Sequence, residues 1–371
     1  MPEFAFDRLR RFPDVEAPNL QAWDATDELL VQRALARDLP GGEVVVIGDE
    51  YGAITLALTD AGRTGVRVHQ DLVTGRRALA RNAEEFGLGG FASHELDASL
   101  LAGARLVLLQ LPKALAELEE IADAVARWAA PDTVLIAGGR VKHMTLAQNE
   151  VLARSFAEVQ PQRAERKSRL IVASGPREVP DEPPYPQRAE HPEFALTLAA
   201  HGGAFAANRI DIGTRVLLEV LEGHHGRSRD VIDLGCGTGA LAAYYALHHP
   251  EARVTATDRS AAAVASARAT MIANDLADRV AVTHDDAGSD LPDGTADLIL
   301  LNPPFHLGAS VHTGAATRLF EASARLLRPG GELLTVFNSS LAYRPDLTRM
   351  IGRTEQLHRT SKFTVTRSIR G

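Results

Sequence analysis

The sequence of 371 residues has one cysteine, Cys236, and no apolar run that approaches the length needed to cross a membrane. A single cysteine excludes an intramolecular disulfide and fits a reducing compartment. The first residues, "MPEFAFDRLRRFPD", are charged and lack the apolar core of a secretory signal peptide. We therefore expect a soluble, cytoplasmic protein that has no membrane partner.

An excess of positive charge is also missing, because the formal net charge is -8, and aromatic residues make up only 5% of the chain. Without a positive field around the whole molecule, nucleic acid must bind to a local basic surface. Two stretches are candidates: "QRAERKSR" (162–169) and the segment from Arg318 to the C-terminus, in which basic residues outnumber acidic ones. The sequence predicts no metal site.

The length of the chain exceeds that of one ordinary domain and suggests two. The stretch between Ser174 and Glu193 contains six prolines, which favour extended backbone and mark a boundary. We predict a first domain over residues 1–174, a proline-rich linker over 175–193 and a second domain over 194–371.

The second half alternates short apolar runs with helix-like stretches. The expected strands include "RDVIDLG", "ARVTATD", "RVAVTHDD" and "ADLILLN", and the expected helices between them include "ALAAYYALHH" and "AAAVASARATMIAND". This alternation is typical of parallel strands joined by crossover helices, and therefore of a doubly wound α/β sheet. A further helix is expected to stop at Pro329-Gly330-Gly331, before another strand.

The first half repeats the same order of features. The segment "VVVIGDEYGAI" (44–54) matches "VIDLGCGTGAL" (231–241), and "LVLLQLPK" (106–113) matches "LILLNPPF" (298–305). The predicted fold class is therefore α/β, with two tandem Rossmann-like domains that arose by duplication. We interpret the first copy as degenerate, a binding or scaffold domain. It carries Val46, Glu50, Gln110 and Lys113 where the second copy has Asp233, Gly237, Asn302 and Phe305.

The turn "DLGCGTG" (233–239) joins an expected strand to an expected helix. Gly235, Gly237 and Gly239 allow a tight turn and the close approach of a ligand to the backbone. The stretch also satisfies a dinucleotide fingerprint, so the glycines alone do not identify the ligand. Asp233, ahead of them, suits a ligand with an ammonium group, which favours S-adenosylmethionine over a nicotinamide dinucleotide.

Further acidic residues complete this predicted cofactor site. Asp258, at the end of the next expected strand, would accept hydrogen bonds from the ribose hydroxyls. Asp286, after the following strand, would accept from the adenine amine, with Asp285 as the alternative. Cys236 has no evident partner base in this loop, and we interpret it as a small filler residue.

The stretch "NPPF" (302–305) follows an apolar run at the expected carboxyl edge of the sheet. The prolines restrict the backbone, so the Asn302 side-chain oxygen and the Pro303 carbonyl can form a fixed pair of acceptors for one NH2 group. Binding both hydrogens turns the lone pair of a ring amine toward a sulfonium methyl, and Phe305 can stack on the ring. We therefore predict Asn302, Pro303, Pro304 and Phe305 as the catalytic residues of methyl transfer.

Several motifs together resemble a known family. The second half contributes "GGAFAANRIDIGTRVLLEVL", "DLGCGTG", "NPPFH", "RPGGEL", "FNSSLAY" and "SKFTVTR", and the first contributes "WDATDELLVQ", "LPK" and "IAGGR". The sequence resembles the bacterial ribosomal RNA guanine-N2 methyltransferases, which have a degenerate first class I methyltransferase domain and an active second one.

This resemblance implies methyl transfer from S-adenosylmethionine to the exocyclic N2 of a guanine in ribosomal RNA, free or in a partly assembled subunit. It also implies that Phe205 helps to cover the cofactor or the base. The family's serine after this phenylalanine is Ala206 here, which offers no hydroxyl.

Other functions stay open at this point. Protein glutamine N5-methylation uses a similar Asn-Pro-Pro turn, but such enzymes usually end it in tyrosine. Adenine-N6 DNA methylation uses the same grip on an amine, but no separate target-recognition domain is evident. A nicotinamide oxidoreductase leaves the Asn-Pro-Pro-Phe stretch unexplained. A catalytically inactive RNA-binding scaffold is the alternative from another class, and the intact motifs of the second half argue against it.

Overall fold

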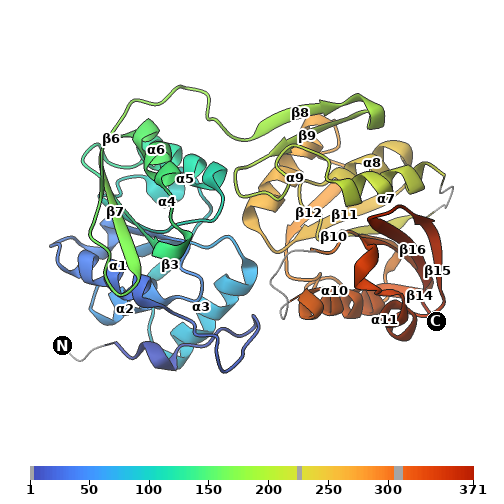
Figure 1. The fold of residues 1–371 in the computed structure, drawn as a ribbon, viewed down its shortest axis with the longest axis horizontal. Helices are drawn as coiled ribbons and strands as arrows, with labels where there is room; N and C mark the ends of the chain where they lie inside the picture. Colours follow the sequence, from blue (N-terminus) through green and yellow to red (C-terminus); the bar gives the residue numbers. More distant parts are fainter. Residues whose placement is uncertain (1–3, 224–227, 305–311) are drawn as a thin grey trace. The chain divides into compact units, whose positions relative to one another are not determined.

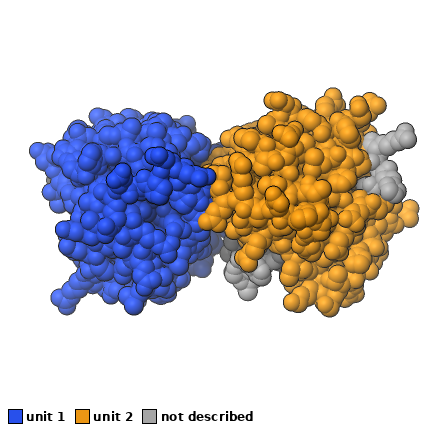
Figure 2. Space-filling view, turned by 90° about the horizontal axis from the view of Figure 1, so that it is seen from above, with its two compact units in different colours: residues 1–185 blue, residues 186–371 orange. Residues whose placement is uncertain are grey.

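The chain folds into two compact units, Met1–Tyr185 (unit 1) and Pro186–Gly371 (unit 2) (Figure 2). The structure, a computed structural model, describes residues 4–223, 228–304 and 312–371. Each unit has its own sheet and its own hydrophobic core. Among the described residues no helix combines the length and the apolar character that a membrane span requires.

Unit 1 is an α/β fold, drawn in blue to green in Figure 1. Its sheet has the strand order β3-β2-β1-β4-β5-β7-β6. The strands are β1 Val44–Ile47, β2 Val66–His69, β3 Phe91–Ser93, β4 Leu106–Gln110, β5 Val134–Arg140, β6 Phe156–Pro161 and β7 Ser168–Pro176. The helices are α1 Ala25–Leu35, α2 Ala53–Asp60, α3 Val73–Phe86, α4 Ala98–Leu101, α5 Leu115–Trp128 and α6 Leu146–Ser155. The first five strands of this order pair in parallel, and β7 is antiparallel to β5 and to β6.

Unit 2 repeats the same strand order as β12-β11-β10-β13-β14-β16-β15, and adds the two-stranded sheet β8-β9. The strands are β8 Gln187–His191, β9 Leu196–Ala200, β10 Asp230–Leu234, β11 Arg253–Asp258, β12 Val280–His284, β13 Ala296–Leu301, β14 Leu327–Asn338, β15 Thr354–Arg359 and β16 Phe363–Ile369. The helices are α7 Ile212–Glu222, α8 Ala240–His248, α9 Ala261–Ala273, α10 His312–Leu326 and α11 Arg344–Met350. The prediction of two tandem Rossmann-like domains is confirmed.

Strand pairing follows the internal repeat residue by residue. In unit 1 Val44 pairs with Leu106, and in unit 2 its counterpart Val231 pairs with Leu298. The same register puts Gln110, the last residue of β4, at the position of Asn302, directly after β13. Each residue at the end of a strand in unit 1 therefore has a known counterpart in unit 2.

Helices cover both faces of each sheet because successive side chains of a strand point to opposite faces. In β1, Val44 and Val46 belong to the core under α1, α2 and α3, whereas Val45 and Ile47 belong to the core under α4, α5 and α6. All four are buried. Because these strands are buried on both faces, their sequences are continuous apolar runs and do not alternate between apolar and polar residues.

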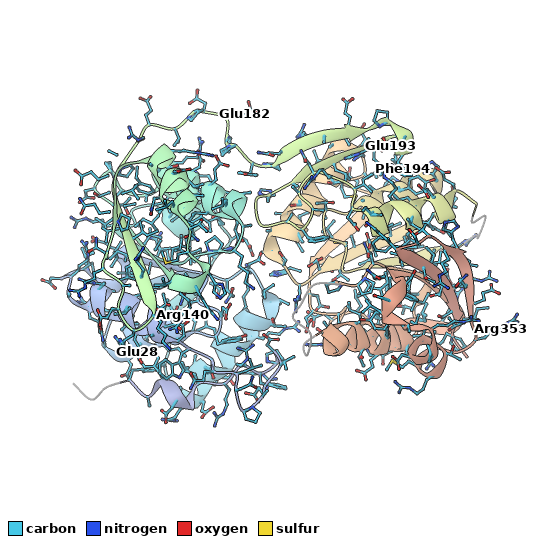
Figure 3. The ribbon with its side chains drawn as sticks, in the orientation of Figure 1. Glu28, Arg140, Glu182, Glu193, Phe194 and Arg353 are labelled. Atoms are coloured by element: carbon cyan, nitrogen blue, oxygen red, sulfur yellow. The ribbon has the colours of Figure 1, made fainter. Side chains whose placement is uncertain are left out.

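The predicted linker 175–193 contains more regular structure than its prolines suggest. β7 extends to Pro176, and β8 starts at Gln187, so residues 177–186 connect the units without a helix or strand. Glu182 lies in this exposed connection (Figure 3). Strand β8 pairs with β9 and belongs to unit 2.

Strand β9 lies along α9 through a row of polar side chains. Asn274, Thr270 and Ser266 accept hydrogen bonds from the backbone N–H groups of Thr197, Ala199 and His201. These acceptors are spaced four residues apart and share one face of the helix. Strand β9 therefore runs from the C-terminal end of α9 toward its N-terminal end. The N-terminus of α9 follows the carboxyl end of β11.

Helix α10 ends at Leu326, before the predicted stop at Pro329, and β14 begins at Leu327. Proline has no N–H to offer a strand ladder. The pairing of β13 with β14 accordingly shifts register between Ala296 and Leu298, opposite this segment. The predicted stop at Pro329-Gly330-Gly331 therefore lies inside β14, and Pro329 comes three residues after the last residue of the helix.

Candidate active site

The predicted site residues of unit 2 follow the carboxyl ends of neighbouring parallel strands. Open α/β sheets bind their ligands at this edge. The glycine turn follows β10, Asp258 ends β11, Asp285 and Asp286 follow β12, and Asn302 follows β13. The strands pair in the order β12-β11-β10-β13, so these groups lie along one edge.

The glycines of the turn have two different structural roles. Gly235, Gly237 and Gly239 all have positive φ, at 77°, 53° and 80°. A Cβ at Gly239 would lie 2.8 Å from Met271 Cε, so this glycine allows α8 to pack on α9. A Cβ at Gly235 or Gly237 would meet no atom of the described residues within 4 Å. These two positions leave open space in front of the backbone.

Asp233 is a buried carboxylate near the end of β10. Its two oxygens differ in their hydrogen bonding. Its Oδ2 accepts a hydrogen bond from the backbone N–H of Ala242, at 3.0 Å. Its Oδ1 is buried and has no hydrogen-bond partner in the described part of the chain. The pKa of Asp233 is raised to about 7, mainly by burial and to a smaller extent by the negative charge of the nearby Asp258. Such a group gains from a cationic partner.

Asp258 is bonded to the glycine turn and to the start of α9. Its Oδ2 accepts from the Gly237 N–H at 2.9 Å, and its Oδ1 accepts from the Ser260 N–H at 2.9 Å. The carboxylate therefore fixes the turn across the gap between β10 and β11. Asp258 is half-buried, so it also faces the edge where a ligand would lie.

Asp285 and Asp286 are both buried, with exposed fractions of 3% and 4%, but they have different partners. Asp285 Oδ1 accepts from the Asp286 N–H and from the Ser289 hydroxyl, and its Oδ2 accepts from the Asp290 N–H. It therefore organises its own turn. Asp286 forms an ion pair with Arg318 of α10.

Asn302 is held at the start of α7. Its Nδ2 lies 2.9 Å from Thr214 Oγ1 and 3.2 Å from Asp211 Oδ2. Its Oδ1 is buried and has no hydrogen-bond partner among the described residues. Pro303 is buried and Pro304 is exposed.

The remaining predicted site residues are aromatic or sulfur-containing. Phe305 lies outside the described residues. Phe205 follows β9 in the segment that leads to α7, and 69% of its surface is exposed. Burial, with further contributions from Asp258 and Asp233, raises the pKa of the Cys236 thiol well above its usual range. This thiol is protonated at neutral pH and is therefore a poor nucleophile.

Comparison with known proteins covers both units. Residues 195–367 match the methyltransferase small domain, and residues 2–177 match the RLMG N-terminal domain. The ribosomal RNA large subunit methyltransferase G of Streptomyces coelicolor is 36% identical over 372 residues, which cover 98% of this chain and 97% of the relative. The protein of the same name from Ectopseudomonas mendocina is also 36% identical, over 98% of this chain and 97% of that protein. The chain belongs to the ribosomal RNA large subunit methyltransferase G family.

A solved structure has the same fold along the whole chain. The 16S rRNA N2 G1207 methyltransferase RsmC of T. thermophilus, in complex with AdoMet and guanosine, aligns with a TM-score of 0.76 and 24% identity. The alignment covers 100% of both chains. This likeness establishes the two-unit fold of the family member described here.

The sequence motifs of this methyltransferase did not point to Asp211, Thr214 and Arg318, although all three contact predicted site residues. A signal for the first two was present. Asp211 precedes an apolar-periodic stretch, as expected of a helix N-cap, and its side chain accepts from the N–H groups of Gly213 and Thr214. Asp24 stands 24 residues before Gly48, as Asp211 stands before Gly235.

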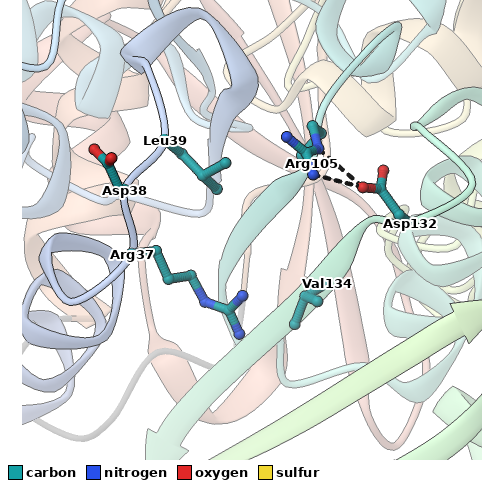
Figure 4. A pocket seen from close by; sticks show the side chains of 6 residues that line it. All are labelled: Arg37, Asp38, Leu39, Arg105, Asp132 and Val134. Carbon is teal, nitrogen blue, oxygen red and sulfur yellow. Dashed lines mark hydrogen bonds and ion pairs between the residues drawn. The ribbon is translucent and has the colours of Figure 1, made fainter.

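Two surface pockets of this family member lie away from the candidate site. The first has a volume of about 280 Å³ and lies beside the amino ends of β4 and β5 (Figure 4). It is lined by Arg37, Asp38, Leu39, Arg105, Asp132 and Val134. Arg105 already donates to Asp132 at 2.7 Å and 3.0 Å. The second pocket lies at the amino ends of β11 and β12, the edge opposite the ligand-binding one. Among the described residues, no group of three or more His, Cys, Asp or Glu side chains is arranged to hold a metal.

Proposed function

We propose that this methyltransferase transfers a methyl group from S-adenosylmethionine to the exocyclic N2 of a guanine in large-subunit ribosomal RNA. The observation that carries the proposal is a pair of buried acceptors at one sheet edge. Asp233 Oδ1 and Asn302 Oδ1 are buried without hydrogen-bond partners in the described residues. Buried polar atoms are normally bonded, so the pair indicates that ligands complete the site. The chain's full-length relatives are named as methyltransferases of this RNA.

The residues of unit 2 fit S-adenosylmethionine as a cation with an amino-acid end. Asp233 would take the ammonium group, and the open backbone at Gly235 and Gly237 would receive the rest of the amino-acid portion. Asp258 would accept from the ribose hydroxyls. The acidic character of this edge suits a ligand that carries a positive sulfonium.

The adenine amine would be bound beside the turn after β12. Asp286 is the first choice for this contact because Asp285 accepts three hydrogen bonds within its own turn. Asp286 is paired with Arg318, so the cofactor would share this carboxylate with α10. Phe205 is exposed and can close over the cofactor or the base.

The amine of the target guanine would be bound by Asn302 and Pro303. The Asn302 side-chain oxygen and the Pro303 carbonyl would each accept one hydrogen of the NH2 group, which directs the nitrogen lone pair away from both. The cofactor, when bound, supplies a methyl group on a sulfonium, a good leaving group. Pro304 would stiffen the turn, and Phe305, which lies outside the described residues, would stack on the base. The amine becomes acidic as it gains positive charge, so water can take its proton.

Unit 1 would bind RNA or act as a scaffold in this scheme. In a paired guanine one N2 hydrogen is bonded to cytosine, and the stacked neighbouring bases cover both faces of the ring, so the enzyme would extrude the base or use an unpaired nucleotide. Free ribosomal RNA or a partly assembled subunit meets this requirement. The second candidate, methylation of a glutamine amide in a protein, would use the same two acceptors on an amide NH2.

Mass-spectrometric mapping of N2-methylguanosine in ribosomal RNA tests the proposed function. A strain that lacks the protein should lose one such nucleotide from the large-subunit RNA. The purified protein and S-adenosylmethionine should restore it on RNA or on particles from that strain. The Asn302→Ala protein, used as the control, should not. Methyl label in a release factor or a ribosomal protein, with unchanged RNA, would replace the proposal with glutamine methylation.

A further inference from the structure

We propose that Asp211 and Thr214 are positioning residues that hold the Asn302 amide in the one orientation in which its oxygen can accept from the substrate amine. The proposal rests on the proposed function, because it concerns the group that would bind the target NH2. Asp211 and Thr214 belong to the N-terminus of α7, and Asp211 lies 91 positions from Asn302 in the chain.

The two ends of the Asn302 amide have different surroundings. Asn302 Nδ2 lies 2.9 Å from Thr214 Oγ1, 3.2 Å from Asp211 Oδ2 and 3.4 Å from Asp211 Oδ1. Its Oδ1 is buried beside Gly213 and has no hydrogen-bond partner among the described residues. A Cβ at Gly213 would lie 3.2 Å from that oxygen, so glycine leaves room beside the acceptor.

The chemistry of Asp211 distinguishes the nitrogen of the Asn302 amide from its oxygen. The two ends of a carboxamide have nearly the same shape, and a flip exchanges a donor for an acceptor. An ionised carboxylate only accepts hydrogen bonds, so Asp211 is compatible with the NH2 end of Asn302 and repels the oxygen end. The carboxylate therefore selects the orientation that leaves Oδ1 for the substrate.

Asp211 and Thr214 are themselves held in place by helix α7. Asp211 is the N-cap of α7, and its Oδ1 accepts from the N–H groups of Gly213 and Thr214 at 2.9 Å and 3.3 Å. The carboxylate is fixed by the same helix that supplies the Thr214 hydroxyl. Helix α7 is in turn anchored in the core by Val216 and Leu217. A catalytic group gains from such support because small displacements weaken catalysis strongly.

Unit 1 retains the same arrangement without the site. Gln110, the counterpart of Asn302, donates from Nε2 to Asp27 Oδ1 at 2.5 Å. Asp27 is the third residue of α1, as Thr214 is of α7, and Asp24 is its N-cap. The contact between the strand end and the helix start is therefore part of the shared architecture. In unit 2 the same contact holds the shorter amide of Asn302, whose buried oxygen has no hydrogen-bond partner in the part of the chain that the structure describes.

Two substitutions separate positioning from folding. Asp211→Asn keeps an oxygen for the N-cap bonds, because asparagine caps helices as well as aspartate does. It also presents an NH2 group to Asn302, which favours the flipped amide. We expect kcat for methyl transfer to fall by about 10- to 100-fold, with the Kd for S-adenosylmethionine and the thermal unfolding midpoint unchanged. Thr214→Val should lower kcat in the same way, and Thr214→Ser should restore most of the lost activity.

A double-mutant cycle with Asn302 decides the proposal. If Asp211 acts through Asn302, the variant with both Asp211→Asn and Asn302→Ala will be no slower than Asn302→Ala alone. Asp24→Asn in unit 1, the matched control, should leave kcat unchanged. Multiplicative losses in the double variant, or a drop in unfolding midpoint that parallels the loss of activity, would overturn the proposal. A wild-type protein that methylates no guanine would instead refute the proposed function.

Discussion

The two units have the same fold but different contents at the carboxyl edge of the sheet. Unit 1 has glycines with positive φ at Gly48 and Gly52, as unit 2 has at Gly235 and Gly239. A Cβ at Gly48 would meet Gln110 Cβ at 3.3 Å, whereas one at Gly235 would meet no described atom within 4 Å. The turn of unit 1 thus has a similar backbone conformation, but Gln110 occupies the space in front of Gly48.

The buried carboxylates of the two turns show the same difference. Asp49 Oδ2 accepts from the Thr55 N–H at 2.7 Å, and Asp49 Oδ1 accepts from the Ile54 N–H at 3.2 Å. Asp233 bonds to one N–H of the corresponding helix, that of Ala242, and retains an oxygen without a described partner. The two units therefore share a topology, but both oxygens of Asp49 are satisfied within unit 1 and one oxygen of Asp233 has no partner among the described residues of unit 2.

The largest expected effect separates the two carboxamides at the strand ends. Asn302→Ala should reduce methyl transfer by about 100- to 1000-fold, because it removes an acceptor aimed at the reacting amine. The affinity for S-adenosylmethionine should stay nearly the same. Gln110→Ala should leave the rate unchanged, which single-turnover assays on RNA would measure. Equal losses of rate and of cofactor affinity in Asn302→Ala would contradict the assigned role.

The next effect concerns cofactor binding by the glycine turn. Gly237→Glu introduces the residue type that unit 1 has at Glu50, and should weaken S-adenosylmethionine binding by about 100-fold through steric overlap and charge repulsion. The reverse change, Glu50→Gly, should create no second site, because Asp49 and Gln110 still occupy that turn. Calorimetric titration should give one site per chain for the wild type and for Glu50→Gly. Two sites in Glu50→Gly would show that unit 1 is closed by Glu50 alone.

Cofactor affinity should also depend on pH through Asp233. Its pKa in the folded protein is about 7, above the unfolded value of about 3.9. This group therefore favours folding of the ligand-free protein below about pH 4, and that contribution is lost as the pH rises to 7. A bound ammonium favours the ionised carboxylate, so affinity should fall by up to about 10-fold per pH unit below 7.

Titrations at several pH values between 5.5 and 7.5 would measure this dependence. Asp233→Asn should bind more weakly and lose the pH dependence. Burial also raises the pKa of Asp49, but both of its oxygens bond to α2. Asp49→Asn, the matched control, should therefore keep the wild-type pH profile. A flat profile in the wild type would exclude Asp233 as the ammonium partner.

The two units should respond alike at the glycines that let a helix pack closely, and there the expected change is in stability and only slightly in activity. A Cβ at Gly52 would lie 2.5 Å from Leu79 Cδ1, and one at Gly239 would lie 2.8 Å from Met271 Cε. Gly52→Ala and Gly239→Ala should each destabilise their own unit by about 1 to 3 kcal/mol. Denaturant unfolding would measure this, with Gly62→Ala, which has open space and the same sign of φ, as the control for backbone strain alone. A much larger loss in one unit would show that the turns are not equivalent.

Charge is the property that the sequence described least well. From Arg318 onward, basic residues outnumber acidic ones in the sequence, which predicted a phosphate-binding surface. In the fold, Arg318, Arg325 and Arg328 pair with Asp286, Asp293 and Asp297, which precede the segment. Arg353 is exposed and lies at the surface of unit 2 (Figure 3). Part of the apparent excess is thus neutralised by partners from other elements.

The sequence alone determined the duplication, the succession of strands and helices along each copy, the glycine turn and the Asn-Pro-Pro turn. These features follow from local chemistry: apolar periodicity, positive φ at glycine and the restricted backbone of proline. Such rules act over a few residues and need no knowledge of distant partners.

Only the tertiary structure decided which polar atoms are satisfied. It brought Asp211 to Asn302 across 91 positions, buried Asp285 and Asp286, and filled the turn of unit 1 with Gln110. The physical reason is that the cost of a buried donor or acceptor depends on the atoms that surround it in space. Those atoms come from segments whose separation along the chain leaves no local pattern.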